Sequence, residues 1–189
     1  MKINEKHPAT RRSFWGKIIA LLACCLLLVS CQPQNQATNN QAQVKLTRVV
    51  SGQTIEVVGI GGQSNLISQV RLIGLDAPDL KQTPWGREAK ELLEHLIGGR
   101  DQPITIEFDI QRKDRLDRIL AYIWKDKTLL NEELIKQGYA LFVDRSPNEK
   151  YHRRLETAQH WARIMGKGIW NPEQPMTLTP REFRQENLY

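Results

Sequence analysis

Two segments of the chain combine arginines and carboxylates in a way that suits chemistry on phosphate. Residues 71–79 read Arg-Leu-Ile-Gly-Leu-Asp-Ala-Pro-Asp, and residues 114–122 read Asp-Arg-Leu-Asp-Arg-Ile-Leu-Ala-Tyr. Brought to one pocket, they would supply two arginines and two carboxylates. Fixed cations stabilise charge on phosphoryl oxygens, and a carboxylate holds a metal ion or positions water. The pattern therefore predicts phosphodiester cleavage.

Each of these residues also has an ordinary structural interpretation. Arg71 could be a surface arginine paired with a carboxylate such as Asp76, and Asp-Ala-Pro-Asp is also a good turn sequence. A third segment, residues 51–54, reads Ser-Gly-Gln-Thr and has no acid that could add to a metal site.

Short runs rich in β-branched residues must position these side chains. They predict strands at 44–50, 53–58, 68–73, 104–108 and 118–124. Apolar residues at helical spacing predict helices at 88–97, 129–137 and 148–165. We therefore expect an α+β fold with a five-stranded barrel and three helices, because closure hides the edges of short strands. This domain would span 44–170, and 171–189 would be a C-terminal tail, loose or lying on the surface.

The N-terminus has the features of an export signal. Basic residues precede a short apolar run at 18–29 that is too short to span a bilayer. The signal, residues 1–30, ends in Leu-Val-Ser before Cys31, which resembles the lipobox of bacterial lipoproteins; an ordinary signal peptide is the alternative. Arg11 and Arg12 fit either a twin-arginine signal or a generic basic region. Residues 31–43, rich in Gln and Asn, would be a tether.

Charge and cysteine content set further limits. Of 27 Lys and Arg and 21 Asp and Glu, five basic and one acidic residue lie in the first thirty positions, so the remainder has a net charge of only +2. A positive binding surface must therefore be local. All three cysteines lie at or before Cys31, so the folded part has no disulfide and no thiolate metal site.

The order and spacing of the motifs resemble the staphylococcal nuclease, or thermonuclease, family over residues 44–170. The resemblance rests on the segments 71–79, 111–122, 131–138 and 168–170. It implies a five-stranded OB-type barrel with three helices. It also implies hydrolysis of DNA and RNA phosphodiesters, usually with Ca²⁺.

The resemblance also implies roles for individual residues. Arg71 would bind phosphate and Arg118 would stabilise the charged transition state. Asp76 and the carbonyl of Ala77 would be metal ligands. Asp79 would position or activate water.

Several positions depart from the family pattern. Gln53 stands where the family has a metal-binding aspartate, and a neutral ligand predicts weaker Ca²⁺ binding. Asp79 replaces a longer glutamate. Leu116 replaces a phosphate-contacting tyrosine. Asp117 replaces a glycine and could pair with Arg118 or simply face water.

Two functions stay open on these grounds. The first is a nuclease with reduced activity or altered metal dependence, anchored through Cys31 to the bacterial cell envelope on its extracytoplasmic side, periplasmic or outer. The second is a non-catalytic OB-type module that binds nucleic acid or a protein. Arg112 and Arg115 could follow a nucleic-acid backbone, although such charged runs often only face solvent. We expect a monomer with DNA or RNA and the membrane as partners.

Overall fold

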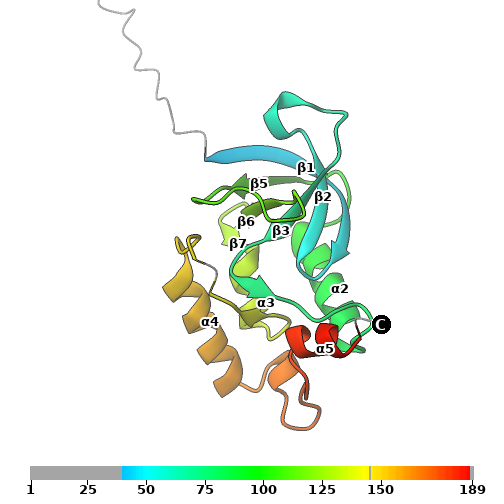
Figure 1. The fold of residues 1–189 in the computed structure, drawn as a ribbon, viewed down its shortest axis with the longest axis vertical. Helices are drawn as coiled ribbons and strands as arrows, with labels where there is room; N and C mark the ends of the chain where they lie inside the picture. The colour runs from blue at the N-terminus through cyan, green and yellow to red at the C-terminus, as the bar shows by residue number, and fades with distance from the viewer. Residues whose placement is uncertain (1–39, 145, 188–189) are drawn as a thin grey trace, which may run out of the picture. The chain divides into compact units, whose positions relative to one another are not determined.

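Five strands close into a barrel, as the sequence predicts (Figure 1). In this computed structural model, residues 40–144 and 146–187 are described. β1 (Gln41–Ser51), β2 (Thr54–Val58) and β3 (Ser68–Leu72) form an antiparallel meander, and β1 also pairs with β5 (Pro103–Glu107). β5 pairs with β6 (Ile119–Lys125), and a parallel pairing of β3 with β6 closes the barrel.

Short elements extend this frame. β7 (Thr128–Leu129) adds a hairpin to β6, and β4 (Leu75–Asp76) pairs with β8 (Leu141–Phe142) in a small second sheet. The 3₁₀ turns are η1 (Ile60–Gly62) and η2 (Gly168–Trp170). The β4–β8 pair matters for function because it holds Asp76 beside the end of β3.

Three helices occupy the predicted places: α2 (Trp85–Ile97), α3 (Leu130–Lys136) and α4 (His152–Ile164). Their apolar stripes are buried against the barrel or against each other, as helical spacing requires. The described chain has a fourth helix, α5 (Pro180–Glu186), in the segment where the sequence predicts only a tail. It begins at a capping box in which Thr179 and Glu182 exchange hydrogen bonds, so part of the expected tail is ordered on the surface.

A buried asparagine ties the barrel to α3. Asn131 has no exposed surface; its Oδ1 accepts from the amide of Ile123 at 2.9 Å, and its Nδ2 donates to the carbonyl of Ile73 at 2.8 Å. Both backbone groups would otherwise be unpaired in the core. Asn131 therefore fixes α3 against β6 and against the chain that leaves β3.

The N-terminal boundary differs from the predicted one. β1 begins at Gln41, within the predicted tether, and Gln41 pairs with Glu107 of β5. The amide of Phe108 also donates to the carbonyl of Asn40. The predicted signal, Cys31 and the tether up to residue 39 lie outside the described residues. Among the described helices, none is long and apolar enough to cross a membrane.

Candidate active site

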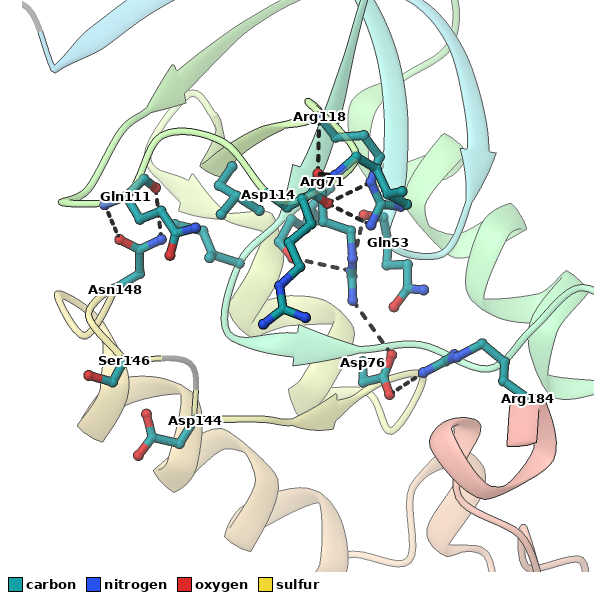
Figure 2. Close-up of a pocket in the computed structure, with 15 residues that line it drawn as sticks. Gln53, Arg71, Asp76, Gln111, Asp114, Arg118, Asp144, Ser146, Asn148 and Arg184 are labelled. Atoms are coloured by element: carbon teal, nitrogen blue, oxygen red, sulfur yellow. Dashed lines mark hydrogen bonds and ion pairs between the residues drawn. The ribbon is translucent and has the colours of Figure 1, made fainter. Parts of the chain in front are cut away.

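A pocket of about 920 Å³ lies where β3, β4, the segment before β6 and α5 converge (Figure 2). Its volume falls in the range of ordinary ligand sites, roughly 300–1,000 Å³. Of the predicted site residues, five line it: Gln53, Arg71, Asp76, Arg115 and Arg118. The pocket thus brings together both arginines that the sequence singled out.

Arg71 is held by the backbone around it. Its Nη1 donates to the carbonyls of Gln53 (3.3 Å) and Leu72 (3.2 Å), and its Nη2 donates to that of Leu75 (3.1 Å). Nη2 also lies 3.5 Å from Oδ1 of Asp76, and the Arg71 side chain is only 9% exposed. The guanidinium is therefore fixed before any ligand arrives, although the fixing contacts use several of its donors.

Arg118 is held by Asp114. Its Nε and Nη2 both lie 2.7 Å from Oδ2 of Asp114, while Oδ1 accepts from the amides of Leu116 (2.9 Å) and Arg118 (3.0 Å). Burial alone would raise the pKa of Asp114, but the hydrogen bonds from Arg118 and the two amides outweigh it, so the pKa lies below its ordinary value. One carboxylate thus shapes the turn and orients the arginine.

Asp117 does not pair with Arg118 in this structure, contrary to the pairing considered from the sequence. Its Oδ1 instead lies 2.8 Å from Nζ of Lys113, and its side chain is 81% exposed. Asp117 has φ of 61°, a left-handed conformation in which glycine is at ease and aspartate is tolerated. The turn directs the Asp117 carboxylate to solvent, and Arg118 pairs with Asp114.

Asp76 contacts two guanidinium groups. Arg71 lies on the side of Oδ1, and Nη2 of Arg184, on α5, lies 2.6 Å from Oδ2 (Figure 2). The Asp76 side chain is 6% exposed, so both contacts are shielded from bulk water. The carboxylate predicted to hold a metal ion is here neutralised by arginines.

Gln53 and Ala77 contact each other. Oε1 of Gln53 accepts from the amide of Ala77 at 2.8 Å. That oxygen is the only acceptor atom of the side chain, and it ties the start of β2 to the residue after β4. Within residues 40–144 and 146–187, no group of three or more His, Cys, Asp or Glu could hold a metal ion.

The remaining predicted residues lie elsewhere. Asp79 does not line the pocket; its Oδ1 accepts from the amide of Lys81 at 2.9 Å, which is the turn interpretation of this sequence. Arg112 stacks 4.8 Å from the centroid of the Phe108 ring and donates to the side chain of Asn40. The catalytic and binding roles assigned to these residues stay predictions.

Sequence reasoning missed several residues of the pocket. Asp114 lies inside a quoted motif but had no assigned role, and Asn148 closes one wall by exchanging two hydrogen bonds with the backbone of Gln111. No sequence pattern indicates a role for Arg184, because it lies in a polar C-terminal segment, 108 positions from its partner Asp76.

Comparison with known proteins finds a family model and several relatives similar to this chain. The family model for the staphylococcal nuclease homologue matches residues 69–172, which include both arginines, Asp76 and Asp114. Thermonuclease of Staphylococcus hyicus is 39% identical over 138 residues, covering 70% of this chain and 78% of the relative. Thermonuclease of Staphylococcus intermedius is 34% identical over 129 residues, covering 65% and 73%. Endonuclease YhcR of Bacillus subtilis is 28% identical over 174 residues, covering 84% of this chain but only 14% of that longer protein.

Proposed function

The chain belongs to the staphylococcal nuclease family, and from that membership we propose that it is an endonuclease that hydrolyses phosphodiester bonds of DNA or RNA in the pocket described above. The observation that carries the proposal is the presence of Arg71 and Arg118 in one pocket, each oriented by fixed acceptors. Two pre-positioned guanidiniums stabilise negative charge on phosphoryl oxygens without reorganising during the reaction.

The two arginines would divide the work by their surroundings. Arg71 is nearly buried and is held by three backbone carbonyls and Asp76, which suits holding a phosphate in register. Arg118 is 29% exposed and is held by a single carboxylate, so it can shift toward the leaving oxygen while Asp114 keeps its orientation. Arg115 lines the same pocket and is exposed, a position from which it would contact the backbone of a longer nucleic acid.

The family resemblance implies Ca²⁺, but the residues present do not fit a calcium site. Ca²⁺ takes six to eight oxygen ligands. Oδ1 of the buried Asp76 has no hydrogen-bond partner among the described residues, but Nη2 of Arg71 lies 3.5 Å from it and Nη2 of Arg184 lies 2.6 Å from Oδ2. Oε1 of Gln53 accepts from the amide of Ala77. The chemistry proposed for the pocket therefore rests on its own arginines.

Cleavage of a single-stranded oligonucleotide by the purified protein tests the proposal. Arg118→Gln should lower the rate by about 10²-fold or more, the usual cost of removing a pre-positioned donor to a charged transition state. The matched control is Arg87→Gln, which removes an exposed arginine of α2 that is paired with Glu91 and does not line the pocket. No cleavage by the wild type, with nucleic-acid binding retained, would replace the proposal with the non-catalytic module.

We also propose that the protein is anchored by lipid at Cys31 on the extracytoplasmic side of the cell envelope. The support is the sequence alone: a short apolar run ends in Leu-Val-Ser before the cysteine. Acylation of this residue would keep the nuclease at a membrane, provided that more than one chain is attached. Metabolic labelling with a fatty acid should mark the wild type and not Cys31→Ala; equal labelling of both would refute the anchor.

A further inference from the structure

Arg184 lies where the family resemblance places a metal ion. Its Nη2 lies 2.6 Å from Oδ2 of Asp76, the predicted metal ligand, and the residue lines the pocket together with Arg71 and Arg118. Figure 2 shows its side chain reaching from α5 toward Asp76. In this position the Arg184 guanidinium supplies positive charge next to Asp76, the carboxylate that would bind the metal ion.

The charge of the pocket depends on this residue. Four arginines line it, namely Arg71, Arg115, Arg118 and Arg184, against three aspartates, namely Asp76, Asp114 and Asp144. Without Arg184 the numbers would be equal, and the pocket would lose its excess of positive charge for an anionic ligand. In addition, Nη1 of Arg184 is buried and has no hydrogen-bond partner among the described residues. A buried donor of this kind is expected to find an acceptor.

The helix that carries Arg184 is held in place by other contacts. The buried Gln82 donates from Nε2 to the carbonyl of Leu178 at 2.7 Å, and Pro180 at the start of α5 is buried. The amide of Met176 donates to the carbonyl of Ile169 at 3.0 Å. The capping box at Thr179 then sets the direction of the helix. Arg184 is therefore brought to Asp76 by a docked segment.

From these contacts we infer that Arg184 is a third phosphate-binding arginine, and that it serves as the fixed cation beside Asp76, so that phosphate binding in this pocket does not require a divalent metal. The inference rests on the proposed function, because it concerns the same pocket. Its Nη2 neutralises Asp76, and the residue lines the pocket, where its guanidinium places a further positive charge for a phosphoryl oxygen.

Binding of a nucleoside bisphosphate tests the inference, because this probe carries phosphate groups and no phosphodiester to cleave. Calorimetric titration would be made with chelator and with Ca²⁺. We expect the wild type to bind equally well in both, and Arg184→Gln to bind about tenfold more weakly in chelator, the loss of one charge-assisted hydrogen bond. Arg184→Lys should recover part of the loss, which also guards against a mere folding defect.

The matched control is Arg181→Gln, which removes the same charge from an exposed position of the same helix and should leave binding unchanged. Wild-type or tighter binding by Arg184→Gln would overturn the inference, because Arg184 would then be structural or would block the pocket. Strong tightening of the wild type by Ca²⁺ would overturn it as well. If Arg118→Gln weakens binding and Arg184→Gln does not, the proposed function stands and only the inference fails. If neither does, both fail.

Discussion

Replacing Asp114 by alanine should destabilise the protein, because one carboxylate organises the whole turn before β6. Its Oδ1 accepts two backbone amides and its Oδ2 contacts two nitrogens of Arg118. Each lost backbone hydrogen bond costs about 1 kcal/mol. The ion pair is partly exposed, at 29% for Arg118 and 20% for Asp114, so solvent screening limits it to about 1 kcal/mol. The expected loss in free energy of unfolding is therefore about 2–3 kcal/mol.

Asp114→Asn separates the charge from the turn. An asparagine keeps the Oδ1 acceptor for both amides but places an amide group against the guanidinium of Arg118. We expect a loss of about 1 kcal/mol, less than for alanine. The matched control is Asp117→Asn, because this exposed residue has the left-handed conformation that asparagine also tolerates. It should change stability by less than about 0.5 kcal/mol.

The effect of Asp114→Asn should depend on pH in a defined direction. The pKa of Asp114 is lower in the folded protein than in the unfolded chain. The stabilisation is therefore complete above the ordinary aspartate pKa of about 3.9, and is lost as pH falls through the lower, folded-state pKa. The difference between wild type and Asp114→Asn should be full at neutral pH and shrink in acid.

Urea unfolding at several pH values, followed by circular dichroism, measures all three variants. The reasoning is refuted if Asp114→Ala is as stable as the wild type at neutral pH, since the four contacts to this carboxylate would then contribute nothing. It is also refuted if the wild type gains over Asp114→Asn as the pH falls. A loss in Asp117→Asn equal to that in Asp114→Asn would mean that general surface charge, and not the turn, sets the stability.

Three further changes test other parts of the structure. Asn131→Leu should lower the free energy of unfolding, measured in urea, by about 2–4 kcal/mol, because two buried backbone groups lose their partner. A smaller loss than in the exposed control Asn65→Leu would contradict the role of Asn131 in fixing α3. Gly138→Ala should lower the free energy of unfolding by about 2–3 kcal/mol, because φ at this residue is 77° and an added Cβ would overlap the carbonyl of Lys167. The melting temperature should fall accordingly, and an unchanged value would contradict the close approach of the two backbones. The double variant Gln53→Asp, Arg184→Gln should bind Ca²⁺ more tightly in calorimetry than the single variant Gln53→Asp, because Arg184 repels a cation beside Asp76. Equal Ca²⁺ binding by the double and the single variant would contradict the repulsion.

The barrel could be predicted because its signals are local. Alternating runs of β-branched residues are typical of strands, and the four motifs in order implied how the strands close. The same motifs predicted that Arg71 and Arg118 share a pocket: Arg71 lies in β3 and Arg118 directly precedes β6, and the OB-type barrel places these two strands side by side. The start of β1 was harder to predict, because the Gln- and Asn-rich composition favours an unstructured tether. Only pairing with β5 makes Gln41 part of a strand.

The partners of the charged groups could not be predicted. Asp114 and Asp117 both lie within four residues of Arg118, and only the backbone of the turn decides which carboxylate faces it. The contact between Arg184 and Asp76 joins segments 108 positions apart and depends on the docking of α5. Asp79 carries a carboxylate in a suitable motif, and in the structure it accepts a hydrogen bond from the amide of Lys81 and does not line the pocket. Tertiary geometry decides these pairings, and residue types alone do not.

The parallel pairing that closes the barrel links the pocket to the opening motions of the whole domain. Only three residue pairs form it, with Arg71 opposite Leu120 in the centre and Arg118 immediately before the first. Any fluctuation that separates β3 from β6 also separates the two arginines. Amide hydrogen exchange along this seam therefore reports how often the pocket comes apart. A phosphate that bridges both arginines must slow that exchange in proportion to its affinity. A ligand of the pocket therefore also stabilises the β3–β6 pairing that closes the barrel.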